Sequence, residues 1–147
     1  MILDLRSISE CVKDIGFTIL HEKSNCLDIE IAEGIIFTFK NMEEVNDNAF
    51  GFKDTPWHSH DKLLLNTKGN EYVELNDIEI IAGIRDGDIL LCEQYLNGIL
   101  SDRWLRHKDE KYDNKFIEAG EEIRISRYPF HSLSGNGRRA RTKKEDG

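Results

Sequence analysis

The sequence predicts an α+β protein, in which an antiparallel sheet of about five to seven strands carries an N-terminal helix and a second, central helix. Three observations predict this class. They are an amphipathic stripe near the N-terminus, alternation of apolar and polar residues over residues 27–31, and an Asn97-Gly98 turn between two β-prone runs. A chain of 147 residues has the size of one domain, and we expect that domain to span residues 1–131.

The N-terminal segment has the pattern of an amphipathic helix from Asp4 to Ile15, and Gly16 is suited to the left-handed residue that ends it. Three short β-prone runs follow, over residues 17–21, 27–31 and 35–39. They predict a meander that packs against the helix. The apolar stripe of the helix consists of Leu5, Ile8, Val12 and Ile15.

The middle of the chain combines loop, strand and helix signals. The polar stretch from Asn41 to Asn48 predicts an exposed loop, whereas Trp57-His58-Ser59-His60 predicts the start of a strand. Apolar residues between positions 72 and 84 fit a helical stripe. Asn76 could cap a helix over residues 77–85 that Gly87 ends, although the β-branched residues at 78–81 are unfavourable there.

Asn97-Gly98 is the clearest local signal, because both residues tolerate the positive φ that a two-residue hairpin turn requires. It joins the predicted strands Ile89–Leu96 and Ile99–Arg106. A two-residue turn places Glu93 opposite Asp102, and two like charges in that position are destabilising. We therefore expect either a bulge or a cationic neighbour.

A last strand is predicted over Glu122–Tyr128, where apolar and polar residues alternate before Pro129. The predicted core draws on the first helix and on the sheet. Its members are Leu5, Ile8, Val12, Ile15, Ile29, Phe37, Leu91 and Ile125.

Charge is distributed unevenly along the chain, whose net charge at pH 7 is −8. The last sixteen residues, from Ser132, hold five basic and two acidic side chains, so they contribute +3 and residues 1–131 contribute −11. With few apolar residues to bury, residues 132–147 are expected to form a flexible basic tail. The acidic body repels nucleic acid and suits a basic protein partner.

The sequence also predicts a compartment. Cys11, Cys26 and Cys92 are an odd number without CxxC spacing, so neither a disulfide framework nor a zinc knuckle is indicated. The chain starts without a signal-peptide pattern, and no apolar run approaches the roughly 18 residues of a membrane span. We expect a cytoplasmic protein with no membrane partner.

The segment Trp57-His58-Ser59-His60-Asp61 is the first group of residues that could carry chemistry. In an extended strand His58 and His60 share a face, where two imidazoles can bind one metal ion and Asp61 could complete the site. In the alternative interpretation, Trp57 anchors the core and the histidines form hydrogen bonds at its edge. We prefer the structural interpretation and expect no cofactor.

Glu93 and Asp102 are the second group, because carboxylates that face each other across a hairpin raise each other's pKa, as acid/base pairs do. Solvated strand faces carry the same residues without any chemistry, and this interpretation is preferred. No nucleophile motif, phosphate-binding loop or His-Glu-x-x-His motif occurs. An enzyme is therefore less expected than a binding protein, and Cys92 is expected to be a packed thiol.

Trp57-His58-Ser59-His60, the helical pattern that ends at Ala82-Gly83 and the Asn97-Gly98 hairpin together resemble small uncharacterised bacterial α+β proteins with a Trp-His-x-His motif. Some of those proteins are similar to immunity proteins of toxin systems. The resemblance covers about residues 50–128 and implies no catalytic residue.

Two functional hypotheses follow. The first is an acidic, non-enzymatic binding protein, immunity-like, that masks a protein partner. The second is a metal-binding protein or metal-assisted enzyme that uses His58 and His60. The sequence does not determine the oligomeric state. The interaction surface expected under the first hypothesis contains Trp57, His58, His60, Glu93 and Asp102.

Overall fold

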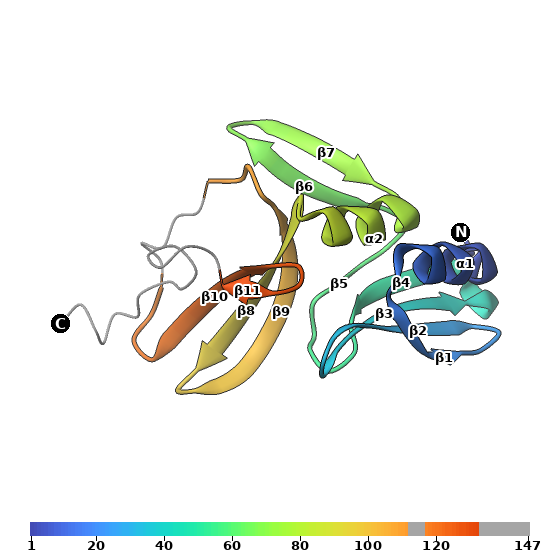
Figure 1. The fold of residues 1–147 in the computed structure, drawn as a ribbon, viewed down its shortest axis with the longest axis horizontal. Coiled ribbons are helices and arrows are strands. Elements are labelled where there is room, and N and C mark those ends of the chain that lie inside the picture. The colour runs from blue at the N-terminus through green and yellow to red at the C-terminus, as the bar shows by residue number, and fades with distance from the viewer. Residues whose placement is uncertain (112–116, 133–147) are drawn as a thin grey trace.

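The computed structural model describes residues 1–111 and 117–132, and it contains two helices, two antiparallel sheets and a separate two-stranded hairpin (Figure 1). The α+β class, with an N-terminal helix and a second helix, is therefore confirmed. The first sheet has the order β1-β2-β3-β4-β5. Its strands are β1 (Thr18–Glu22), β2 (Cys26–Ala32), β3 (Ile35–Met42), β4 (Asp47–Phe52) and β5 (His58–Ser59).

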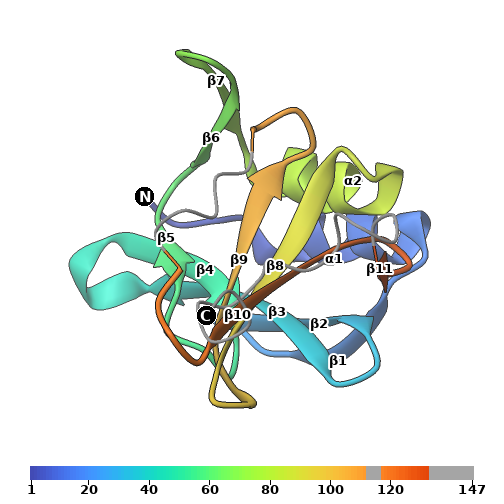
Figure 2. The same cartoon turned by 90° about the vertical axis from the view of Figure 1, so that its left-hand side faces the viewer.

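The second sheet has the order β11-β10-β8-β9, so the strands expected in one sheet are divided between two. The division follows from the intervening chain, in which a β6–β7 hairpin and helix α2 separate β5 from β8. Figures 1 and 2 show this hairpin projecting from the body. These elements are β6 (Leu63–Lys68), β7 (Glu71–Leu75), β8 (Ile89–Leu96), β9 (Ile99–His107), β10 (Glu121–Arg127) and β11 (His131–Ser132).

Both helices begin and end within one residue of the predicted bounds. Helix α1 (Leu5–Ile15) is capped by Asp4, whose carboxylate accepts a hydrogen bond from the Ser7 amide at 3.1 Å. Helix α2 (Asp77–Asp86) begins with a capping box between Asn76 and Glu79. The apolar residues before Asn76 belong to β7 and not to the helix.

The stretch from Asn41 to Asn48 is not the exposed loop that its polarity predicts. Strand β3 extends to Met42, a short 3-10 turn η1 (Glu43–Val45) follows, and β4 begins at Asp47. Asn41 and Asn48 are buried. The Asn41 amide is paired with the backbone of Leu3, accepting from its N–H at 2.8 Å and donating to its C=O at 2.9 Å. A polar side chain that binds distant backbone cannot be distinguished from a loop residue by polarity alone.

The β8–β9 hairpin turns at Asn97-Gly98, as predicted. Leu96 pairs with Ile99, and a bulge after Gln94 then shifts the register by one residue. Glu93 consequently lies opposite Arg103 and not opposite Asp102. The bulge and the cationic neighbour that the sequence led us to expect are both present, because the bulge places Arg103 opposite Glu93.

One large core cluster joins the two sheets and both helices, and a smaller cluster lies on the other face of the second sheet. Every predicted core residue is buried except Ile15, which is half-buried against the cluster. Burial raises the pKa of the packed Cys92 thiol to about 12. No helix among the described residues combines the length and apolar character that crossing a membrane requires.

The predicted tail lies almost wholly outside the described residues. Ser132, its first residue, pairs with Ser126 as the end of β11, so it belongs to the second sheet. Residues 133–147 are not described by the structure.

Candidate functional site

The Trp-His-x-His segment lies at the edge of the first sheet, where it approaches the second sheet. In this segment β5 is only two residues long and places His58 opposite Gly51 of β4. A Cβ at Gly51 would collide with the carbonyl oxygen of Trp57, so glycine permits this close approach. The Trp57 amide donates to Asp102 Oδ1 of β9 at 3.0 Å. The structure therefore brings Trp57, which precedes β5 of the first sheet, to Asp102 of the second sheet.

Trp57 is half-buried against the core and its ring lies 6.1 Å from that of Phe52. It is therefore a partial anchor, and one side remains open to solvent.

His58 and His60 lie side by side, with ring centroids 5.2 Å apart, and both are exposed. His58 Nδ1 is 3.0 Å from the Pro56 carbonyl oxygen, and His60 Nδ1 is 2.5 Å from that of Asn48. A carbonyl oxygen only accepts hydrogen bonds, so each Nδ1 carries a hydrogen, and in the neutral form of each ring the lone pair is on Nε2. The two Nε2 atoms are the groups left for a ligand.

Asp61 does not join the histidines. It has a positive φ of 61°, and its carboxylate accepts from Asn48 Nδ2 at 2.7 Å while its amide donates to Asn48 Oδ1 at 2.8 Å. Within residues 1–111 and 117–132, no group of three or more His, Cys, Asp or Glu side chains is arranged to hold a metal ion.

Glu93 and Asp102 do not form a carboxylate pair. Glu93 Oε2 accepts from Arg103 Nε at 3.0 Å, and both side chains are largely buried. Asp102 is the neighbour of Arg103 on β9, so its side chain points to the opposite face of the strand. There its carboxylate accepts from the amides of Trp57 and of Arg103, so the predicted pairing is wrong because of the bulge.

A groove of about 330 Å³ lies beside Trp57, between β6 and β9. Next to it, the β6–β7 hairpin exposes Leu64 and Tyr72, each to more than 60% (62% and 61%). Five of its ten lining residues are apolar, and Lys62 and Glu110 are its charged lining residues among those described. The apolar lining consists of Trp57, Leu63, Leu64, Leu65 and Leu105.

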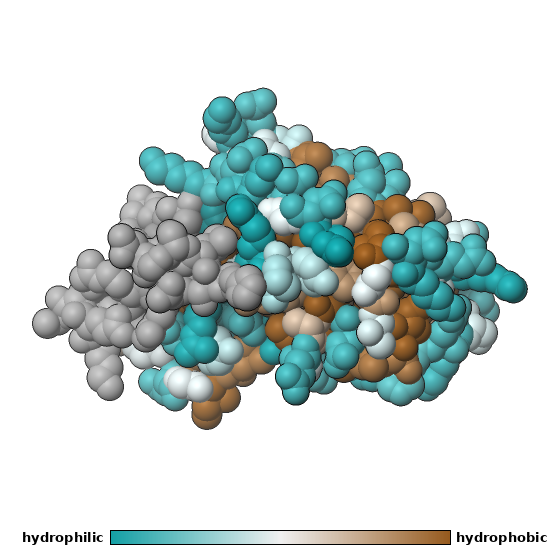
Figure 3. Space-filling model, viewed as in Figure 1, coloured by the Kyte–Doolittle hydropathy of each residue, from teal (hydrophilic) through white to brown (hydrophobic). Residues whose placement is uncertain are grey.

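A second exposed apolar patch lies at the tip of the β8–β9 hairpin, where Leu96 and Ile99 reach solvent. In Figure 3 it is the brown tip at the bottom of the molecule. The segment from Trp57 to His60 adjoins the groove, and the hairpin tip is a separate surface.

A polar cluster that no sequence pattern indicated surrounds Asp28, which is 3% exposed. Lys53 Nζ and Thr38 Oγ1 each donate to its carboxylate at 2.8 Å, and His21 Nδ1 lies at 3.2 Å. Burial raises the pKa of this carboxyl, but the hydrogen bonds from Lys53, Thr38 and His21 outweigh burial and lower it to about 2. Three different strands and a loop supply the cluster, so no sequence spacing could have indicated it.

Cys26 also contacts Asp28, since its thiol donates to the carboxylate at 3.5 Å. Cysteine, histidine and aspartate are the residue types of a nucleophilic triad. Here, however, burial and the Asp28 charge raise the pKa of the Cys26 thiol, whereas a nucleophilic cysteine needs a lowered pKa. The cluster is therefore suited to holding strands together and not to covalent catalysis.

The fold and the site together define a small α+β protein with two antiparallel sheets and, where the sheets meet, an edge that carries the half-buried Trp57 and the exposed His58 and His60. No family model matches the chain, and neither a curated protein nor a solved structure shows significant similarity to it.

Proposed function

We propose that this chain is a non-enzymatic, immunity-like binding protein that masks a basic protein partner. The observation that carries the proposal is the groove beside Trp57, together with the exposed Leu64 and Tyr72 on the projecting β6–β7 hairpin. Exposed apolar patches next to a groove are typical of protein interfaces, and aromatic residues near a pocket are frequent binding hot spots.

Net charge supports the choice of a basic partner. Residues 1–131 carry a net charge of −11, and the basic remainder of the chain brings the total to −8. A surface of one sign accelerates association with a partner of the opposite sign and disfavours partners of the same sign. We place this association in the cytoplasm, where Cys11, Cys26 and Cys92 would stay reduced.

The contacts of Asp102 and Glu93 support binding better than catalysis. Asp102 holds the Trp57 amide, and Glu93 is neutralised by Arg103. Their role on this proposal is to fix the aromatic edge, so that Trp57, His58 and His60 form the interaction surface beside the groove.

The test uses the protein encoded by the adjacent gene, which on this proposal is a basic toxin. Calorimetry should show binding that weakens with salt, because charge attraction is screened. Leu64→Asp should weaken binding by about tenfold or more, as expected for an interface anchor. The matched control is Val45→Asp, which changes a similarly exposed apolar residue (66%) in η1 and should leave the affinity unchanged. A neutral or acidic neighbour, or equal effects of the two substitutions, would contradict the proposal.

A second candidate function, metal binding, is favoured by the geometry of the two histidines. Histidines that bind metals usually donate their other ring N–H to a carbonyl or carboxylate, as His58 and His60 do here through Nδ1. A metal ion would need further ligands from water or from a partner. The Asp61 carboxylate could be a ligand only if it gave up its hydrogen bond from the Asn48 side chain.

Elemental analysis of protein purified without a histidine tag decides between the two functions. The metal hypothesis requires near-stoichiometric metal that is lost in both His58→Ala and His60→Ala but kept in His107→Ala. Our preferred function predicts no bound metal and an unchanged melting curve in chelator.

A further inference from the structure

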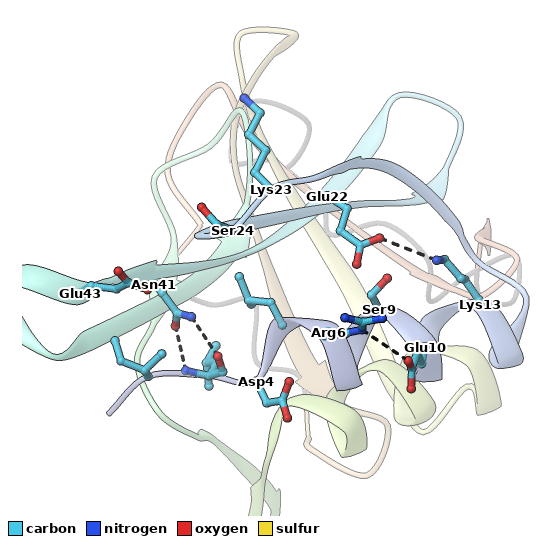
Figure 4. Close-up of a pocket in the computed structure, with 13 residues that line it drawn as sticks. Asp4, Arg6, Ser9, Glu10, Lys13, Glu22, Lys23, Ser24, Asn41 and Glu43 are labelled. Atoms are coloured by element: carbon cyan, nitrogen blue, oxygen red, sulfur yellow. Dashed lines mark hydrogen bonds and ion pairs between the residues drawn. The ribbon is translucent and has the colours of Figure 1, made fainter.

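A cavity of about 570 Å³ lies between the first turns of α1 and the turn that joins β1 to β2 (Figure 4). Its size is within the range of small-molecule sites. Asn41 and Glu43 border it on a third side, as the close-up shows. The apolar lining comes from Ile2, Leu3 and Leu5 of the N-terminal segment.

Ser9 is the unexplained residue of this cavity. It is 1% exposed, and its hydroxyl has no hydrogen-bond partner among the described residues. Figure 4 shows the hydroxyl oxygen pointing from α1 toward the side where Glu22 lies. A buried hydroxyl without a partner is unfavourable, and a ligand that bonds to it removes that penalty.

The charged groups around the cavity are of both signs. Two ion pairs lie at its rim: Arg6 to Glu10 at 3.9 Å along α1, and Lys13 of α1 to Glu22 of β1 at 3.7 Å. Long ion pairs between exposed side chains contribute little to stability, so these groups can turn toward a ligand at small cost. The full set of charged lining residues is Asp4, Arg6, Glu10, Lys13, Glu22, Lys23 and Glu43.

The mixture of positive and negative charges around the cavity restricts the class of ligand that the cavity can bind. A purely anionic or purely cationic ligand would meet about as many like charges as opposite ones, whereas a zwitterion can place each of its charges beside an opposite one. We infer that the cavity binds a small zwitterion, an amino acid with an aliphatic side chain. The Ser9 hydroxyl bonds to a charged group of the ligand, and Leu3 and Leu5 contact its apolar part. The site is independent of the groove beside Trp57.

The test is an NMR titration of the full chain with L-leucine, up to the solubility limit of the amino acid. Saturable shifts should be confined to the amides of α1 and of the β1–β2 turn. N-acetyl-L-leucine lacks the ammonium charge and L-leucine methyl ester lacks the carboxylate. Each should bind at least about tenfold more weakly, because it loses one charged contact.

Ser9→Ala should bind leucine about five- to tenfold more weakly while its Tm stays the same or rises, because an unpartnered buried hydroxyl is removed. Thr55→Val is the matched control, since Thr55 Oγ1 is another buried hydroxyl without a partner among the described residues but lines a different hollow. Its leucine affinity should be unchanged. The inference is overturned by the absence of saturable shifts, by equal binding of either derivative, or by a Ser9→Ala affinity equal to that of the wild type.

Discussion

At the scale of single residues, Asp28 is a buried carboxylate that several hydrogen-bond donors surround. It lies opposite His21 of β1 and Thr38 of β3, and Lys53 after β4 reaches it as well. A buried carboxylate is costly unless its charge is compensated, and here a lysine and two further hydrogen-bond donors compensate it. The Asp28 side chain of β2 thus links this strand to β1 and β3 and, through Lys53, to the segment that follows β4.

We predict that Asp28→Asn lowers the free energy of unfolding by about 2 kcal/mol at neutral pH, which corresponds to the lowering of the Asp28 pKa from 3.8 to about 2. Because the folded-state pKa is depressed, the stabilisation is present above the unfolded pKa and is lost as pH falls through the folded pKa. Urea unfolding of both proteins between neutral pH and about pH 2 should therefore converge at the acid end. Glu33→Gln, in an exposed turn, is the control and should show little difference at any pH.

Trp57 offers a second prediction at this scale. Removal of a fully buried tryptophan costs about 3 to 5 kcal/mol, and Trp57 is only half-buried, so Trp57→Ala should cost about 2 kcal/mol. His58→Ala, at an exposed neighbour, should cost less than about 1 kcal/mol. Chemical denaturation measures both. Equal losses for the two variants would show that Trp57 does not anchor the edge.

At the scale of elements, the β8–β9 hairpin depends on its bulge. The shift after Gln94 lets Arg103 and Glu93 pair at 3.0 Å, with side chains only 11% and 15% exposed. The same shift turns Asp102 toward Trp57. The bulge therefore positions both an internal ion pair and the contact between the two sheets.

Replacing one partner of the Glu93–Arg103 ion pair should destabilise the protein more than replacing both partners. Arg103→Met leaves Glu93 as a largely buried charge without its partner and should cost about 3 kcal/mol. The double variant Glu93→Leu/Arg103→Met replaces both charges with apolar groups and should be more stable than Arg103→Met alone. Urea unfolding of the two single variants and the double variant tests this. Additive losses would mean that the two side chains are not coupled.

At the scale of the whole molecule, one core holds the two sheets together. Helices α1 and α2 contact each other, α2 also contacts β8, and β6 contacts β9. The shared cluster includes residues of both helices and both sheets.

Truncation after Ser132 tests the predicted tail. The cut keeps the Ser126–Ser132 pair of β11 and removes only residues 133–147. The Tm should change little, because the removed segment has few apolar residues with which to dock. A melting experiment that shows a loss of several degrees would mean that the basic segment docks on the acidic body.

The local elements could be predicted because their causes lie within a few residues of each other in the chain. Gly16 ends α1, Asn76 and Glu79 start α2, and Asn97-Gly98 turns the hairpin, each through contacts with near neighbours. The candidate site was predicted in part. Its aromatic segment was found, but the Glu93–Asp102 pair was wrong, because a bulge of one residue changes which side chains face each other.

The sequence by itself determined the α+β class, both helices, the central hairpin and most of the core, since periodicity and capping act locally. Only the tertiary structure decided that the strands form two sheets, that Asn41 and Asn48 are buried, and that Asp28 gathers donors from other strands. It alone brought Asp102 to Trp57 and enclosed Ser9 in a cavity. The physical reason is that these contacts join residues far apart in the chain, and their geometry is set by packing and register, which no local pattern records.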